Sequence, residues 1–103
     1  MPIRPDQTSK TQQEKWAQIR AQVGGRIREL RLSNGLTQEA LALEVGMSRN
    51  MLIHLEWGKR SIAYERLWDI AVVLGVAVEE LLKPPAHAPS SGPRRGGSGP
   101  RRP

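Results

Sequence analysis

Apolar residues recur at spacings of three and four along the first third of the chain, which places them on one face of an α-helix. The members of this stripe are Trp16, Ile19, Val23, Ile27 and Leu30. Gly24 and Gly25 interrupt it, and each glycine costs a helix roughly 1 kcal/mol relative to alanine. We therefore predict a long helical stretch with a break or bend at the two glycines.

The next two predicted helices are short and lie close together. The first follows Thr37, whose hydroxyl suits a helix N-cap, and ends at Gly46, which suits a left-handed C-cap. The second starts at Ser48, another good N-cap, and ends before Gly58. A short helix, a tight turn with glycine and a second helix form a helix-turn-helix unit.

Two further helices complete an all-α fold. Residues 61–74 carry apolar residues at helical spacing, namely Ile62, Leu67, Ile70, Ala71 and Leu74. Residues 78–82 predict a short helix that Pro84 and Pro85 stop. The middle of the chain has no sustained alternation of apolar and polar residues, which a half-buried strand would require.

Composition divides the chain into three zones. Residues 1–10 have the composition of a flexible arm, and residues 11–83 hold nearly all the large apolar residues. Residues 84–103 contain six of the eight prolines and four arginines. Such a segment cannot bury a core, so we expect a disordered Pro/Gly/Arg-rich tail. We expect the helical domain to span residues 11–83, and its first part, 11–23, to be an extra N-terminal helical stretch.

The positive charge is spread unevenly over these zones. The chain has 16 Lys and Arg against 10 Asp and Glu, a formal net charge of +6 at pH 7. A basic balance favours a polyanionic partner such as nucleic acid. The tail alone contributes +4, however, and residues 11–83 contribute +1. The case for nucleic acid therefore rests on where the basic residues lie rather than on their number.

Several function classes lack their chemistry in this sequence. There is no cysteine, and His54 and His87 lie far apart, so we expect no disulfide, metal site or cofactor. No paired carboxylates and no nucleophile with a neighbouring base stand out, so we do not expect an enzyme. The longest apolar run, residues 70–78, is nine residues long. A membrane span needs about 20 residues, so we expect no membrane partner.

Five segments between Val23 and Leu82 share one recognisable pattern, and they are Arg26–Arg31, Gly35–Ala42, Val45–Ser48, Leu55–Arg60 and Ala71–Val76. Over this range the chain resembles the Cro/repressor-type (XRE) helix-turn-helix family. Trp68 stands where this family usually has an aliphatic core residue, so the resemblance places Trp68 in the core. The resemblance implies a repressor-like domain of five α-helices, in which the second and third helices form the DNA-reading unit. It also implies a sequence-specific DNA-binding transcriptional regulator that acts as a repressor.

The resemblance assigns base reading to the helix of residues 48–57, which enters the major groove in this family. The outward residues near its start are Arg49, Asn50, Ile53 and His54. Arginine can bond guanine O6 and N7 in bidentate fashion, and asparagine can pair with adenine N6 and N7. Ile53 could contact a thymine methyl group. Asn50 and His54 lie one turn apart on the same side.

Family position also suggests which residues contact phosphates and which stabilise the fold. We expect phosphate contacts, which set affinity and register but not sequence choice, from four residues. They are Gln38, Ser48, Lys59 and Arg60. Arg31 and Glu56 are expected to form a structural ion pair that joins the first and third helices.

The expected partners are double-stranded DNA and a second copy of the chain. Family repressors often pair through the fourth and fifth helices, where Val72 and Val73 form either a partner surface or scattered surface apolarity. Trp57 either packs over the loop or lies on the DNA backbone. An alternative function is an antitoxin or coactivator-type interaction module that binds a toxin or the transcription machinery. We expect a cytoplasmic protein, associated with the nucleoid through DNA.

The uneven distribution of charge predicts that the tail adds affinity for DNA but no sequence preference. Deleting residues 84–103 should remove most of the net charge and some salt-dependent affinity for DNA, because each phosphate contact contributes a slope of about 0.9 in log K against log salt. The sequence preference should stay intact in a selection experiment on randomised duplexes. A truncated protein without any preference would make the tail the reader and the helix assignment wrong.

Overall fold

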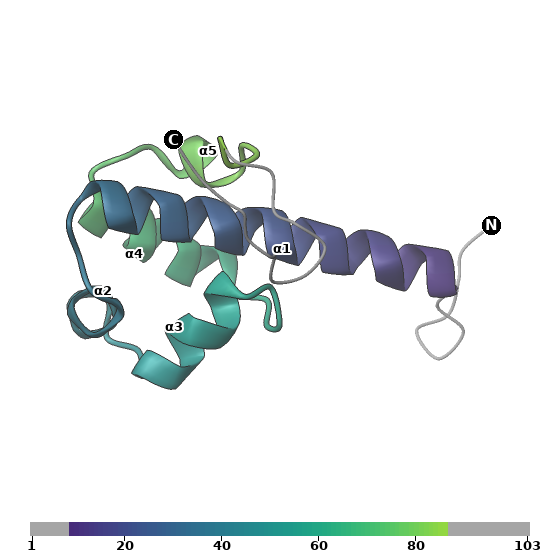
Figure 1. The fold of residues 1–103 in the computed structure, drawn as a ribbon, viewed down its shortest axis with the longest axis horizontal. Helices are drawn as coiled ribbons and strands as arrows, with labels where there is room; N and C mark the ends of the chain where they lie inside the picture. Colours follow the sequence, from purple (N-terminus) through teal and green to yellow (C-terminus); the bar gives the residue numbers. More distant parts are fainter. Residues whose placement is uncertain (1–8, 87–103) are drawn as a thin grey trace, which may run out of the picture.

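The computed structural model describes residues 9–86, which form five α-helices and no strand in that range. The predicted all-α class is confirmed. The helices are α1 (Lys10–Ser33), α2 (Gln38–Val45), α3 (Arg49–Glu56), α4 (Tyr64–Leu74) and α5 (Val78–Leu81) (Figure 1). Helix α4 starts three residues later than expected.

Local hydrogen bonds set the starts of the first three helices. The hydroxyls of Ser9, Thr37 and Ser48 each accept a bond from the backbone N–H three residues later. Such a bond satisfies one of the free N–H groups of the first turn. The N-caps predicted at Thr37 and Ser48 are therefore confirmed. Helix α4 has Ala63 at this position and no side-chain cap.

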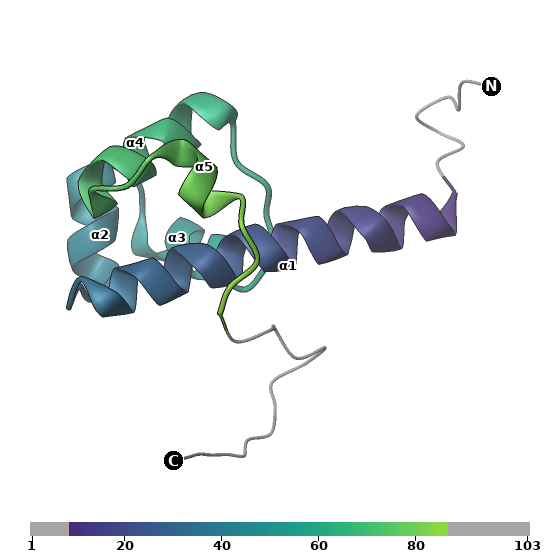
Figure 2. The ribbon, with the colours of Figure 1, turned by 90° about the horizontal axis from the view of Figure 1, so that it is seen from above.

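Helix α1 runs across the whole domain, and its first half projects beyond it (Figures 1 and 2). Helix α3 lies on one side of α1 and α5 on the other, and α4 packs against both α2 and α5. Each of the five helices contributes one large, fully buried side chain to a single core. These are Ile27, Leu41, Leu52, Ile70 and Leu81.

The expected break at the two glycines is wrong, because α1 is continuous through them. Gly24 is buried against the end of α3, and a Cβ there would overlap the Leu55 carbonyl oxygen and lie 2.8 Å from that of Glu56. A Cβ at Gly25 would instead meet the Pro85 ring at 3.4 Å. The glycines therefore permit close packing of other segments, and that packing offsets their low helix propensity.

The expectation that Trp68 lies in the core is wrong. Trp68 is 60% exposed and does not belong to the core, which α4 reaches with Leu67 and Ile70 instead. Trp68 shares the outer face of α4 with Tyr64 and Val72, both of which are also exposed. On α1, Trp16 and Ile19 are exposed while Val23 packs against the core. The first half of the stripe thus does not cover the core of its own domain.

The described chain continues past residue 83, the expected end of the helical domain, to residue 86. Pro85 is buried, and the Ala86 N–H donates to both Glu29 carboxylate oxygens at 3.1 and 2.9 Å. A truncation that tests the tail should therefore begin at residue 87. Most of the expected arm, residues 1–8, and the tail beyond residue 86 lie outside the described residues.

An ion pair between Arg26 and Glu80 also links α5 to α1. The Arg26 guanidinium donates to the Glu80 carbonyl oxygen at 2.8 Å and lies 3.0 Å from the Glu80 carboxylate. The pKa of Glu80 is lowered, first by its hydrogen bond to Lys83 and then by Arg26. The pKa of Arg26 is raised, chiefly by its hydrogen bond to Glu29. The contacts from Arg26 to Glu80 link the C-terminal segment to α1, whereas the first cause of each pKa shift is a neighbour in the same segment.

A buried ion pair joins α1 to α3, as the sequence predicted. The Arg31 Nε lies 2.7 Å from Glu56 Oε2, and the two side chains are 7% and 0% exposed. A second bond runs from Arg31 Nη2 to Glu56 Oε1 at 3.1 Å, and Nη1 donates to the Leu36 carbonyl at 2.8 Å. Gln38 Nε2 donates to Glu56 Oε1 at 3.2 Å. The network thereby links α1, α2 and α3.

The close approach at Gly24 predicts the effect of adding one methyl group. We expect Gly24→Ala to lower the free energy of unfolding by about 1–3 kcal/mol, because overpacking forces the α3 backbone away. Gly25→Ala is the matched control, since its Cβ meets one ring at contact distance and alanine favours the helix. Urea unfolding of both variants tests this. Equal stability of the two would show that α3 can shift freely.

The ion pair predicts a loss of stability without a change in DNA reading. Arg31→Met should lower the free energy of unfolding by about 3–5 kcal/mol, because it leaves the buried Glu56 carboxylate without its cation. Adding Glu56→Leu should recover much of that loss. Arg28→Met, at an exposed position on the same helix, should change it by less than about 0.5 kcal/mol. A changed base preference in folded Arg31→Met would contradict a purely structural role.

Candidate nucleic-acid interface

Helices α2 and α3 form a helix-turn-helix unit around a three-residue turn, residues 46–48. Gly46 adopts φ 72°, which L side chains rarely do, and the next N–H, of Met47, bonds back to the Ala42 carbonyl at 2.9 Å. Ala42 is buried on α2 and belongs to the hydrophobic core. Leu52 and Leu55 of α3 are buried in the same core as α2.

An arginine from α4 fixes the end of α2. Arg66 Nη2 donates to the carbonyls of Val45 and Gly46 at 2.7 and 3.0 Å, and its Nη1 pairs with Asp69 at 2.9 Å. Helix α2 has no basic residue in its own last turn, so this cation supplies the C-terminal partner. Sequence reasoning missed Arg66, because its partners lie about 20 residues away. The arginine holds the turn that sets the direction of α3.

The four expected base-reading residues share one side of α3. Arg49, Asn50 and His54 are exposed and Ile53 is half-buried, whereas Leu52, Leu55 and Glu56 point into the protein. Helix α3 lies at the lower edge of the domain in Figure 1. The packing of α3 thus leaves a mixed polar and apolar face available to a partner.

The expected phosphate-binding residues occupy three different settings. Gln38 is the first residue of α2, and its amide is held by Glu56. Ser48 is the N-cap of α3, and its hydroxyl oxygen accepts the Met51 N–H at 3.0 Å. Lys59 and Arg60 are exposed on the segment after α3. Their assignment to phosphates stays a prediction.

The segment carrying Lys59 is fastened to α1. Arg20 Nε donates to the Gly58 carbonyl at 3.3 Å, and a Cβ at Gly58 would lie 2.7 Å from Ala21 Cα. The Lys59 N–H also bonds to the His54 carbonyl at 2.9 Å. The backbone at Lys59 is therefore held by contacts with both α1 and α3.

Trp57 adds an aromatic ring at the end of α3. It is 63% exposed, and its ring centroid lies 6.4 Å from that of His54, at an interplanar angle of 58°. The ring therefore borders the expected reading face. The sequence left open whether Trp57 packs over the loop or lies on the DNA backbone, and it did not place the ring beside His54.

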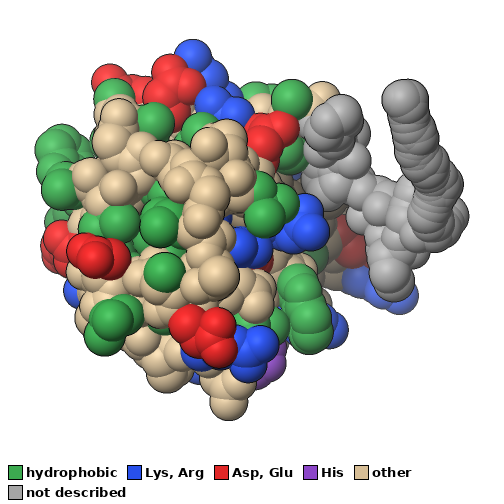
Figure 3. All heavy atoms as spheres, turned by 60° about the vertical axis from the view of Figure 1, so that its left-hand side comes forward, with side chains coloured by type: hydrophobic (Ala, Val, Ile, Leu, Met, Phe, Trp, Pro, Cys, Tyr) green, Lys and Arg blue, Asp and Glu red, His purple; other side chains and the backbone are tan. Residues whose placement is uncertain are grey.

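Charges of both signs occur near this face. Arg49 Nε lies 3.7 Å from Glu39 Oε2 of α2. Figure 3, which shows one side of the domain, likewise has Lys and Arg side chains interleaved with Asp and Glu. At the start of α3, a partner would thus meet the Glu39 carboxylate beside the Arg49 guanidinium.

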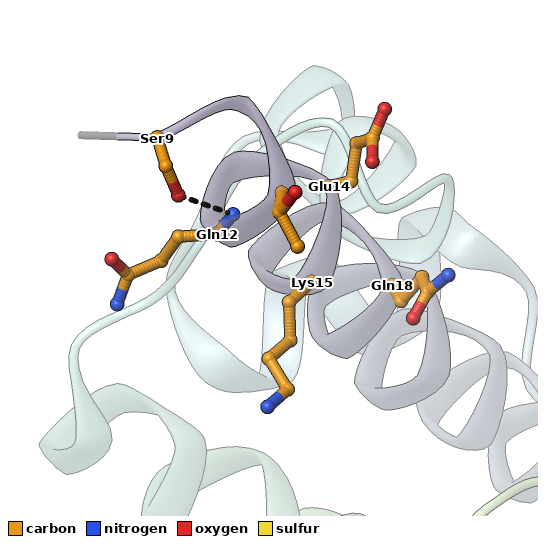
Figure 4. A pocket seen from close by; sticks show the side chains of 6 residues that line it. Ser9, Gln12, Glu14, Lys15 and Gln18 are labelled. Carbon is orange, nitrogen blue, oxygen red and sulfur yellow. Dashed lines mark hydrogen bonds between the residues drawn. The ribbon is translucent and has the colours of Figure 1, made fainter.

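The described residues offer little else that could act as a site. A hollow at the start of α1 is lined by polar side chains that diverge from one another (Figure 4), and it is formed by Ser9, Thr11, Gln12, Glu14, Lys15 and Gln18. Within residues 9–86 no group of His, Asp and Glu is arranged to hold a metal ion. No helix in this range is long and apolar enough to cross a membrane.

Comparison with known proteins gives consistent matches. A helix-turn-helix family model (HTH_3) matches residues 27–81. An uncharacterised HTH-type transcriptional regulator, y4dJ of Sinorhizobium fredii, is 37% identical over 71 residues, which are 69% of this chain and 92% of the relative.

Solved structures agree with these matches. The restriction-modification controller C.AhdI of Aeromonas hydrophila is 34% identical, with a TM-score of 0.58 over 59% of this chain and 92% of the controller. The biofilm regulator SinR, solved in complex with DNA, is 27% identical, with a TM-score of 0.57 over 59% of this chain and 98% of SinR. With its α2–turn–α3 unit and the family match over 27–81, this chain belongs to the Cro/repressor-type helix-turn-helix family of DNA-binding transcriptional regulators.

Proposed function

We propose that this protein is a sequence-specific repressor that inserts α3 into the major groove of double-stranded DNA. The observation that carries the proposal is the exposed side of α3, where Arg49, Asn50 and His54 stand free of the core beside the half-buried Ile53. These side chains include the donors and acceptors that distinguish base edges in the major groove. SinR, which shares the fold, has been solved with DNA.

The phosphate contacts come from the flanks of α3. Gln38 has one amide N–H bonded to Glu56, and its second N–H is suited to a phosphate oxygen. The Ser48 hydroxyl accepts a bond as the cap and keeps its own proton to donate. Lys59 and Arg60 supply charge at the other end of α3. Such contacts fix the register of the base-reading residues on the duplex.

Repression follows from occupancy of a promoter. The described residues form one small domain around the reading unit, and a protein of this kind acts most simply by covering DNA that RNA polymerase needs. Two copies related by a two-fold axis would read two half-sites about one DNA turn, roughly 34 Å, apart. We propose that the copies pair through α4 and α5, near the exposed Val72 and half-buried Val73.

The proposal predicts that base preference depends on α3. Sequence selection from randomised duplexes with the full chain should return an inverted repeat. Arg49→Ala with Asn50→Ala should flatten the preference, with each lost bidentate contact costing about 1–3 kcal/mol of discrimination. Lys59→Ala should weaken binding to all sequences alike and lower the salt slope by about 0.9.

Matched controls separate reading from folding. Arg28→Ala removes an exposed cation from α1 and should leave the preference unchanged, and thermal melting should show all variants folded. Binding that is equal on all sequences and insensitive to the Arg49 and Asn50 changes would overturn the proposal. A selected site without a repeat would argue against the paired arrangement.

A further inference from the structure

Glu39 is an acidic side chain at the edge of the expected DNA-binding face. It belongs to the first turn of α2, yet its carboxylate lies 3.7 Å from the Nε of Arg49, the first residue of α3. The two side chains are 73% and 53% exposed. An acid in this position repels phosphates, so its presence beside a base-reading residue requires a physical account.

Stability does not supply that account. An exposed ion pair contributes little to folding, because water screens the charges and ordering two long side chains costs entropy. The distance of 3.7 Å is also too long for a hydrogen bond between nitrogen and oxygen. Glu39 can favour the start of α2 through the helix dipole, but that role needs no arginine from α3 beside it.

The geometry points to Glu39 as a positioning residue that determines sequence specificity by orienting Arg49. This inference rests on the proposed function of α3. The carboxylate approaches the Nε edge of the guanidinium. The opposite edge, with Nη1 and Nη2, forms no hydrogen bond with any residue that the structure describes. Those two nitrogens are a pair of parallel donors suited to bidentate contact with guanine O6 and N7.

DNA binding would strengthen this arrangement. Excluding water from the groove lowers the local dielectric constant, so the attraction between the two charges rises. Closing the 3.7 Å separation to hydrogen-bond length takes a movement of less than about 1 Å. Without Glu39, the long Arg49 side chain could swing to a neighbouring phosphate, which any sequence offers. Glu39 therefore lowers the affinity for DNA in general and raises the preference for one base pair.

The charge on Glu39 makes two explanations separable. If it only repels phosphates, removing it raises affinity for every duplex by one factor. If it orients Arg49, removing it lowers affinity for the preferred duplex relative to all others. Glu44 is the matched control, because it is an exposed acid on the same helix that forms no ion pair or hydrogen bond with the described residues of α3. Glu44→Ala changes the net charge by the same amount.

The experiment measures dissociation constants of the full chain on the selected duplex and on duplexes altered at each base pair. Glu39→Ala should reduce the preference about tenfold at one base pair, the same pair at which Arg49→Ala relaxes it. Glu39→Ala combined with Arg49→Ala should be no less selective than Arg49→Ala alone. Glu39→Gln keeps an acceptor oxygen and should retain part of the preference, while Glu44→Ala should leave the preference unchanged.

Three outcomes would overturn the inference. Equal gains in affinity on all duplexes, as in Glu44→Ala, would reduce Glu39 to a repelling charge. Relaxation at a base pair that Arg49→Ala leaves intact would make Glu39 a direct reader, since a carboxylate can accept from cytosine N4. A wild-type chain without any preference would instead refute the proposed function, and the inference with it. Unchanged melting temperatures would rule out misfolding as the cause in each case.

Discussion

The contact between α1 and α3 is the constraint on which the rest of the domain depends. At Gly24 the two backbones are so close that no side chain fits between them. One and two turns farther along α1, Ile27 and Arg31 face the same side, and the Arg31 guanidinium meets a carboxylate that is completely buried. Because Glu56 also holds Gln38, the position of α2 depends on the same acid. A small chain without disulfides thereby fixes its reading unit on one long helix.

In α3, the residues that hold the helix in the domain differ from those expected to contact DNA. The residues that hold α3 are buried and point inward, whereas those expected to touch DNA lie on the opposite side of the same eight-residue helix. Arg66 fixes the turn before α3, and Arg20 fastens the segment after it. Both ends of α3 are thus tied by cations from other helices. The reading face can vary in sequence without disturbing these supports.

Local chemistry was predictable from the sequence, and contacts between distant segments were not. The caps at Thr37 and Ser48 and the left-handed Gly46 follow from residues within one turn of each other. The straight course of α1 through Gly24 depends on carbonyls some 30 residues away, which helix propensity cannot register. Trp68 was misplaced because α4 has a second apolar stripe on its outer side. The contacts of Arg66 with the end of α2 and of Glu39 with Arg49 were not predicted, because each joins residues of different helices.

The placement of the tryptophans has a practical consequence for spectroscopy of this protein. All three, Trp16, Trp57 and Trp68, lie on the surface, on three different helices or helix ends. Their emission therefore reports on the solvent around α1, the end of α3 and the outer face of α4 rather than on the state of the core. Each ring serves as an optical probe of one separate face, and loss of the packed interior is better followed through the helical backbone.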